Sequence, residues 1–238
     1  MLLVKPTVKR QVVSRAERAL ATRRRMLASA RDLFVEQGYA ATTVEQIAAD
    51  AGVAVQTVYY TFRTKGLLLC ELVEVTAAGE EPAVPVLGRA WAREMLSATS
   101  AQRVLALAVE HGTAIYERVA ALWPAVTAAA GADPDVTAYW QGVGAGRRDG
   151  QRQMVARIAG LDALRPGLDP ERATDLVVTL LGHDVYRSLV IEAGWSLPTF
   201  RAWLFTTVVQ QLLGPVELEP RATEDLSYDR FLGGSDRA

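Results

Sequence analysis

The sequence predicts an all-α protein, in which an N-terminal three-helix domain with a helix–turn–helix precedes a larger C-terminal helical bundle. Apolar residues recur at spacings of three and four along almost all of the 238 residues, which is the period of amphipathic helices. Alternating runs bounded by turn dipeptides, which are typical of strands, are missing. Proline and glycine separate the periodic segments, as they do at helix ends.

The first predicted helix covers residues 22–37, and its apolar stripe is formed by Met26, Leu27, Ala30, Leu33 and Phe34. Gly38 follows as the stop signal, because a left-handed residue is cheapest without a Cβ atom. Thr43 and Gln46 have the spacing of a capping box, which predicts a second, short helix through Asp50.

A tight turn at Gly52 separates this short helix from a third one over residues 55–62. Two short helices joined by such a turn meet at a steep angle and can place the second helix in a DNA major groove. We expect Val53, Val58 and Phe62 to fill the core beneath. The outward side chains are then Val55, Gln56 and Tyr60, with Thr57, Tyr59 and Thr61 on the flanks. Hydroxyls suit phosphates, an amide suits a base edge, and a small apolar group suits a thymine methyl.

Longer helices are expected beyond this motif, the first of them capped by Thr64. The predicted ranges are 65–78, 88–98, 101–122, 135–159, 171–193 and 198–213. In the last two, the apolar residues occupy more than one stripe. A helix that must bury two faces has a core on one side and usually a partner on the other. We expect a homodimer interface that contains Leu180, Val185, Leu189, Trp203, Leu204 and Val208.

Charge is distributed unequally along the chain, although the formal net charge is only −1. Residues 1–65 contain eleven Lys or Arg and five Asp or Glu, whereas residues 66–238 contain fifteen and twenty-two. A basic part joined to an acidic remainder indicates that the first part contacts a polyanion. The predicted division is a basic arm (1–20), the helix–turn–helix domain (21–66), a bundle for ligand binding and dimerisation (67–214), and an acidic tail (215–238).

Several classes of protein are excluded by composition. The single cysteine allows no intrachain disulfide, and one cysteine with two histidines makes no zinc finger. The longest charge-free stretches fall short of the roughly 20 apolar residues of a membrane span, and the N-terminus lacks the apolar run of a signal peptide. We therefore expect a cytoplasmic protein without a metal or cofactor.

The run TTVEQIAADAGVAVQTVYYTFRTKGLLL, preceded by LFVEQGY, resembles the DNA-binding domain of TetR-family repressors. The run EAGWSLPTFRAWLFTTVVQQLLG is similar to the last two helices of that family, which form its dimer interface. The resemblance implies phosphate contacts by Thr43 and Lys65, and base reading by Val55, Gln56 and Tyr60. It also implies that Thr57, Tyr59 and Thr61 contact phosphate or pack at the DNA backbone. Thr61 stands where the family often has histidine, and Glu45 where it can have a base-reading arginine. The operator sequence is therefore not transferred.

The resemblance also implies a cavity for a small apolar or amphipathic ligand in the bundle. Its expected lining is Trp91, His111, Tyr116, Trp123, Trp140 and Arg147. The alternative for the histidine and the tryptophans is an ordinary place in the core, and for Arg147 it is a buried ion pair or a twist of the helix. Gly142, Gly144 and Gly146 are better explained by close helix packing than by a nucleotide loop, since no strand precedes them.

These observations favour a homodimeric regulator, most simply a repressor, that is released from a palindromic DNA operator by a small ligand. The expected partners are double-stranded DNA, a second copy of the chain and a small molecule. Two alternatives stay open. One is a ligand-independent architectural DNA-binding protein. The other is an enzyme with a vestigial DNA-binding motif, although the sequence contains no nucleophile–base or metal constellation.

Overall fold

The computed structural model describes residues 14–79 and 88–214, and over these residues it consists of helices joined by short connections, without a strand. The prediction of an all-α fold is thus confirmed. The first thirteen residues of the expected arm and the whole expected tail, 215–238, lie outside the described residues.

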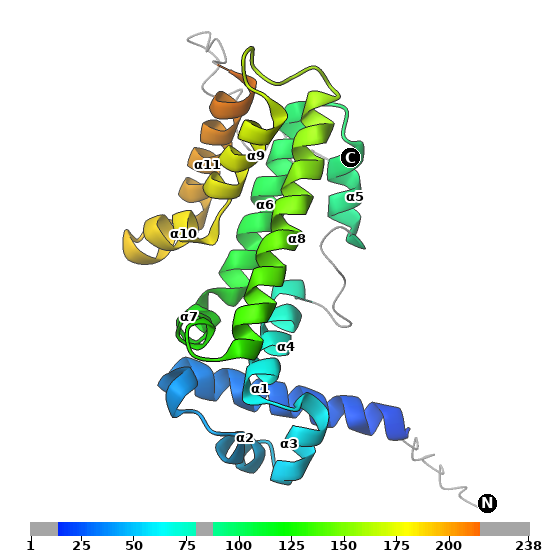
Figure 1. Cartoon of the computed structure of the whole chain (residues 1–238), viewed down its shortest axis with the longest axis vertical. Helices are drawn as coiled ribbons and strands as arrows, with labels where there is room; N and C mark the ends of the chain where they lie inside the picture. The colour runs from blue at the N-terminus through cyan, green and yellow to red at the C-terminus, as the bar shows by residue number, and fades with distance from the viewer. Residues whose placement is uncertain (1–13, 80–87, 215–238) are drawn as a thin grey trace, which may run out of the picture.

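The molecule is elongated, with α1, α2 and α3 at one end and α5, α9 and α11 toward the other (Figure 1). The long helix α8 runs between the two ends. The helices are α1 (Arg15–Ala41), α2 (Val44–Asp50), α3 (Val55–Phe62), α4 (Lys65–Ala78), α5 (Ala90–Ser97), α6 (Ala101–Val119), α7 (Trp123–Ala130), α8 (Pro134–Ala159), α9 (Pro170–Leu180), α10 (His183–Tyr186) and α11 (Leu197–Leu213). A 3₁₀ turn, η2 (Ala120–Leu122), precedes α7, and a π-helical turn, η3 (Arg187–Glu192), follows α10.

Helix α1 begins at Arg15, seven residues before the predicted start, so the part of the expected arm from residue 15 onward is helical. The cause is a capping box that the sequence contains as S-R-A-E. The Ser14 side chain accepts a hydrogen bond from the Glu17 backbone, and the Glu17 carboxylate accepts one from the Ser14 backbone. The predicted break at Gly38 is present, with φ of +79°, and the helical run then continues to Ala41.

The helix–turn–helix forms as the sequence predicts. Thr43 caps α2, and the reciprocal bonds of the box join the Gln46 N–H to the Thr43 hydroxyl at 3.2 Å and the Thr43 N–H to the Gln46 amide oxygen at 2.8 Å. Gly52 makes the turn with φ of +64°, which strains any residue with a Cβ. Val58 and Phe62 are buried beneath α3, as expected.

The chain packs around two hydrophobic cores. The first, which we call the head core, joins α1–α4 to α7 and to the first turn of α8. The second, the body core, joins α5, α6, the distal half of α8, α9, α10 and α11. Helix α7 had no counterpart among the predicted helices, yet it lies against α1 and closes the head core. The helices of residues 21–66 therefore share one core with α4 and α7.

The predicted helix over residues 171–193 is wrong in one respect, because it is broken at Gly182. This residue is extended, with φ of −80° and ψ of 152°, and begins α10 on a new axis. A Cβ atom added there would lie 2.8 Å from the Thr179 carbonyl oxygen, so the bend requires glycine.

The middle of α8 is uncovered in the single chain. Residues 141–147 are all exposed over nearly two helical turns. A Cβ atom added at Gly142, Gly144 or Gly146 would meet nothing within 4 Å, so close packing within this chain does not explain these glycines, contrary to the prediction.

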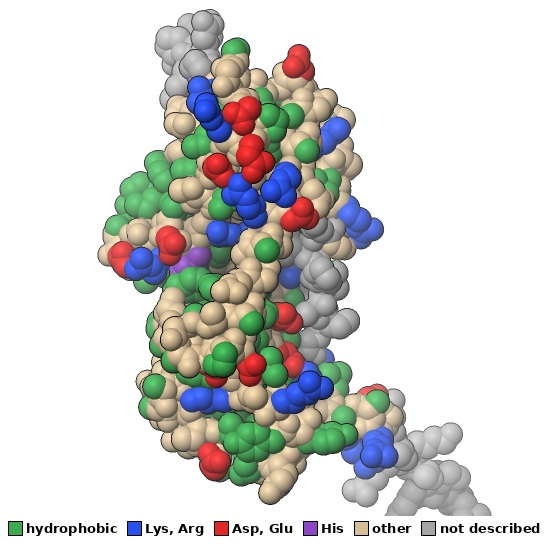
Figure 2. All heavy atoms as spheres, viewed as in Figure 1, with side chains coloured by type: hydrophobic (Ala, Val, Ile, Leu, Met, Phe, Trp, Pro, Cys, Tyr) green, Lys and Arg blue, Asp and Glu red, His purple; other side chains and the backbone are tan. Residues whose placement is uncertain are grey.

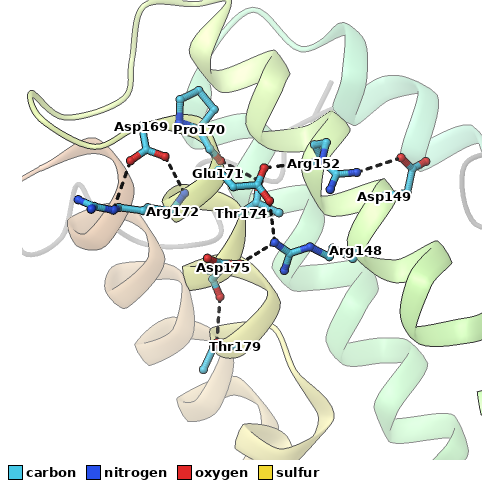
Figure 3. A network of polar contacts seen from close by, with 10 residues as sticks. All are labelled: Arg148, Asp149, Arg152, Asp169, Pro170, Glu171, Arg172, Thr174, Asp175 and Thr179. Carbon is cyan, nitrogen blue, oxygen red and sulfur yellow. Dashed lines mark hydrogen bonds and ion pairs between the residues drawn. The ribbon is translucent and has the colours of Figure 1, made fainter. Parts of the chain in front are cut away.

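Charged side chains tie α8 to α9 just beyond this uncovered stretch. Arg148 donates to the Glu171 carboxylate at 2.8 Å and to that of Asp175 at 2.7 Å, and Arg152 lies next to Asp149 and Glu171 (Figure 3). Figure 2 shows the same mixture of acidic and basic side chains on the surface of this end of the molecule. The distal half of α8 is thereby fixed to the body.

Among the described residues, no helix is long and apolar enough to cross a bilayer.

Candidate functional site

The exposed face of α3 lies at the extreme end of the head (Figure 1). Tyr60 is 92% exposed and Tyr59 46%, which is far more than the packing of a core aromatic leaves. Gln56 is exposed beside them, whereas Val55 is half-buried against the head core. The structure therefore exposes two of the three predicted base-reading side chains, Gln56 and Tyr60, on one surface, and leaves Val55 only partly exposed. Their contacts with bases stay a prediction.

The threonines of the head are mainly held by backbone groups. Thr43 is exposed and caps α2, so its hydroxyl lies at a helix N-terminus, where anions are favoured. The Thr61 hydroxyl donates to the Thr57 carbonyl at 2.7 Å, within α3. Both α3 threonines are half-buried on its flanks, as the sequence predicts.

Lys65 has a structural role that the sequence did not reveal. Its ammonium donates to the carbonyl oxygens of Tyr39, at 2.8 Å, and Thr42, at 2.9 Å, and lies 4.1 Å from the centre of the Tyr39 ring. Burial lowers the pKa of Lys65, and the charge of Asp133 opposes that shift. The cation thus holds the end of α1. Two of the three ammonium hydrogens are donated to these carbonyls, so the predicted phosphate contact of Lys65 would have to use the third.

The head is hydrogen-bonded to the start of α8. The Tyr39 hydroxyl donates to the Asp133 carboxylate at 2.5 Å, and the Thr64 hydroxyl donates to that of Asp135 at 2.7 Å. Asp133 also caps α8 by accepting from its backbone, and lies directly over Gly66. Burial and the Asp133 carboxylate raise the pKa of Tyr39, so its hydroxyl stays protonated and donates. We call this contact the Asp133 link.

A cluster of aromatic rings lies where the two cores meet. The rings of Trp123 and His183 stack with centroids 3.3 Å apart and planes at 26°, and Trp140 lies 5.0 Å from Trp123. Tyr116 meets His183 edge-on at 5.6 Å and lies 5.8 Å from Tyr186. The two tryptophans pack on the head core and the two tyrosines on the body core, so the stack joins the cores. We call this group the junction cluster.

The polar groups of the junction cluster are unequally satisfied. The Tyr116 hydroxyl donates to the Leu181 carbonyl at 2.6 Å and accepts from the Arg147 guanidinium at 3.3 Å. Arg147 is exposed, so neither a buried ion pair nor a fully buried position describes it. His183 is 6% exposed, and its Nδ1 atom is buried without a hydrogen-bond partner. Burial lowers the pKa of His183 to about 4, so the ring is neutral at neutral pH.

Four of the six predicted ligand residues belong to or touch the junction cluster, namely Tyr116, Trp123, Trp140 and Arg147. The other two, Trp91 and His111, form a separate pair between α5 and α6, stacked at 4.6 Å and 14°. Burial lowers the pKa of His111 as well. His183 itself was not among the predicted ligand residues. The signal that could have found it is Gly182, because a glycine between two apolar helical stretches marks a bend that turns its neighbour inward.

One groove lies elsewhere, between α1, α4 and α6, with a volume of about 590 Å³. It is lined by Arg24, Arg31, Val75, Thr76, Gly79, Glu117 and Arg118. None of the six predicted ligand residues lines this groove.

The predicted dimer residues divide into two sets. Leu180, Val185, Leu189 and Trp203 are half-buried and can still lose exposed area to a partner. Leu204 and Val208 are 1% and 0% exposed inside the body core, so they have no surface to offer, and their assignment to an interface was wrong. The misassignment arises because the inner and outer stripes of α11 are both apolar. Figure 2 shows hydrophobic side chains gathered on the side of the molecule where α10 projects, and Ile191 of η3 is 56% exposed.

This combination of a helix–turn–helix with an exposed third helix and a separate helical body is typical of bacterial transcriptional regulators. The family model described as "Bacterial regulatory proteins, tetR family" matches residues 26–72. A helix–turn–helix transcriptional regulator of Mycobacterium bovis is 33% identical over 176 residues, which cover 72% of this chain and 73% of the relative. A regulator of Mycobacterium tuberculosis matches equally well.

Solved structures share the fold over most of the chain. SmeT in its complex with triclosan superimposes with a TM-score of 0.62 at 21% identity, covering 83% of this chain and 99% of SmeT. NalD of Pseudomonas aeruginosa, the secondary repressor of the MexAB-OprM multidrug efflux pump, gives 0.63 at 18% identity, covering 82% and 98%. The chain belongs to the TetR family of transcriptional regulators.

Proposed function

We propose that this regulator is a homodimeric repressor that binds a palindromic operator with the α3 face of each subunit and leaves it when a small apolar or amphipathic molecule binds the body. The observation that carries the proposal is the position of the junction cluster. It joins the two cores, so a ligand that binds there would change how the head packs against the body.

One connection leads from the junction cluster to the DNA-binding head, and a second one joins the helices within the head. Trp140 is on α8, whose first residues are bonded to Tyr39 and Thr64 through Asp133 and Asp135. On the other side, the Arg23 guanidinium binds the Glu71 carboxylate of α4 and lies 5.0 Å from the centre of the Phe62 ring of α3. A shift of α4 or α8 is therefore passed to α3. A ligand shifts this equilibrium only if it binds the two conformers with different affinity.

The DNA-binding half of the proposal is tested by selecting genomic fragments with the purified full chain and mapping the protected sequence. We expect an inverted repeat whose half-sites lie about one helical turn, ~34 Å, apart. The variant Tyr60→Ala removes a ring that is almost fully exposed, so we expect about tenfold weaker binding to this sequence with an unchanged melting temperature. The matched control is Val143→Ala, which shortens a surface side chain on α8. Equal affinity of Tyr60→Ala and the parent would contradict base reading by α3.

The regulatory half is tested by screening small molecules for thermal stabilisation and then measuring DNA release. A ligand that binds the folded chain raises its melting temperature by mass action. We expect the stabilising compounds to lower the affinity for the operator. Operator affinity that is indifferent to every stabilising compound would favour an architectural DNA-binding protein.

A further inference from the structure

We propose that the junction cluster binds a flat, neutral aromatic molecule carrying a hydroxyl group, and that Nδ1 of His183 forms the hydrogen bond to this hydroxyl. The inference rests on the proposed ligand response and specifies the chemistry of the ligand. It is built on the buried nitrogen of His183, on the rings around it and on the exposed stretch of α8 nearby.

The first argument is the unpartnered nitrogen. A buried polar atom without a hydrogen bond carries a free-energy cost, and native structures nearly always satisfy such atoms. Nδ1 of His183 is one of the two side-chain atoms in the described part of the chain that are buried without a partner. A hydroxyl both donates and accepts, so it satisfies this nitrogen in either tautomer of the neutral ring. The low pKa of His183 is consistent with this, since the ring presents no charge.

The second argument is the shape of the surroundings. His183 is stacked face to face on Trp123 and meets Tyr116 edge-on, so flat rings contact the imidazole on two sides. Trp123 and Trp140 are only half-buried, and the neighbouring α8 residues 141–147 are uncovered. A flat ring can add to this group of rings by its face or its edge, which a branched aliphatic molecule cannot do.

The third argument is charge. The Arg147 guanidinium lies 3.3 Å from the Tyr116 hydroxyl, beside the cluster. The Asp184 carboxylate acts on His183 with the opposite sign, so charges of both signs surround the imidazole and the site favours neither a cationic nor an anionic ligand. A neutral ligand avoids the cost of desolvating a charge beside the rings.

The test compares two probes of equal shape, 2-naphthol and 2-methylnaphthalene, by equilibrium dialysis against the full-length protein. We expect the parent chain to bind 2-naphthol about tenfold more tightly, since one hydrogen bond to a buried group is at stake. His183→Phe keeps a planar ring in the stack, so we expect it to bind both probes with equal affinity. His111→Phe replaces the only other histidine and should keep the preference of the parent. A preference that persists in His183→Phe, or failure of the parent to bind either probe, would overturn the inference.

A second measurement uses the parent chain and does not depend on the folding of a variant. With ¹⁵N-labelled histidine the spectrum contains two rings, which His111→Phe assigns. We expect 2-naphthol, but not 2-methylnaphthalene, to shift the Nδ1 resonance of His183, and a shift confined to His111 would refute the site. The operator assay separates the two levels of the proposal. Binding of 2-naphthol at His183 without DNA release supports the site and contradicts the ligand response, whereas release by a compound that leaves His183 unperturbed supports the response and contradicts the site.

Discussion

At the residue scale, the molecule places two polar side chains inside apolar surroundings for different reasons. Lys65 is satisfied by two carbonyl groups and an aromatic face, so its burial costs little. His183 has no such partners and remains neutral instead. The first arrangement stabilises the fold, and the second leaves a buried nitrogen without a hydrogen bond.

The stability of the chain should depend on pH through His183. Its pKa in the folded chain is about 4, against an ordinary value of 6.5. Between these values the unfolded chain binds more protons, so the free energy of unfolding falls as the pH is lowered from 6.5 toward 4. In urea denaturation at pH 7, 6, 5 and 4.5, we expect His183→Phe to lose less stability over this range than the parent. His111→Phe, which removes a less perturbed histidine, should retain the His183 part of the slope. A slope in His183→Phe equal to that of the parent would contradict the burial of a neutral ring.

At the element scale, α8 is held by polar contacts at its start and in its distal half, whereas its middle is exposed. Asp133 and Asp135 join its first turn to the head, and Arg148 joins its distal half to α9. The three glycines between these points have open space around them and weaken the helix by roughly 1 kcal/mol each relative to alanine. Movement between the head and the body is therefore most easily accommodated in this stretch.

Replacing Gly66 by alanine should disrupt the Asp133 link. The new Cβ atom would lie 2.6 Å from a carboxylate oxygen of Asp133, so the carboxylate must move away from Tyr39. We expect Gly66→Ala to lower the free energy of unfolding by roughly 1–3 kcal/mol. In an Asp133→Ala background the obstacle is absent, and the same substitution should cost much less. A double-mutant cycle of chemical denaturation measures the difference, and additive effects would show that the two residues do not constrain each other.

Glycines in two parts of the chain should respond to alanine in opposite directions. Gly144→Ala adds a methyl group to an exposed helix with nothing within 4 Å, so we expect the free energy of unfolding to rise by about 1 kcal/mol. Gly182→Ala places a Cβ atom 2.8 Å from the Thr179 carbonyl, so we expect the free energy of unfolding to fall and the α9–α10 bend to be disturbed. Thermal denaturation of both variants and of the parent shows whether each melting temperature rises or falls. A loss in Gly144→Ala would mean that its helix face is covered in solution.

The elements of this fold follow from the sequence to different degrees. Local signals predicted α2, α3 and α4 well, because Thr43, Gly52 and Thr64 act on the residues next to them. The bend at Gly182 was not predicted, because the apolar pattern continues on both sides of it and a single glycine inside a helical pattern is tolerated. The junction cluster was predicted only in part, for a different reason. Trp123, Trp140 and His183 are far apart in the sequence, and only the packing of α7 and α10 brings their rings together.

At the scale of the whole molecule, the head and the body expose different kinds of surface. The head presents α3 at one end, and the body leaves a hydrophobic surface around η3 uncovered on the side where α10 projects (Figures 1 and 2). Since α11 buries Leu204 and Val208 in the body core, it offers a second subunit its outer stripe with Trp203, beside the half-buried Leu180, Val185 and Leu189 of α9, α10 and η3. A partner placed there keeps both heads free to face the same DNA duplex.

The variant Ile191→Glu should therefore separate the subunits. Ile191 is 56% exposed, so a charge there is harmless in the monomer but would be buried twice across a two-fold interface. We expect sedimentation equilibrium to show a monomer at concentrations where the parent is a dimer, with the helical circular dichroism spectrum unchanged. The variant should also lose high-affinity binding to an inverted repeat while retaining weak binding to a single half-site, because the two heads no longer bind as one unit. Val35→Glu, which alters a 47% exposed side chain on α1 in the head, should remain dimeric and control for the added charge. A dimeric Ile191→Glu would place the interface on another face of the body.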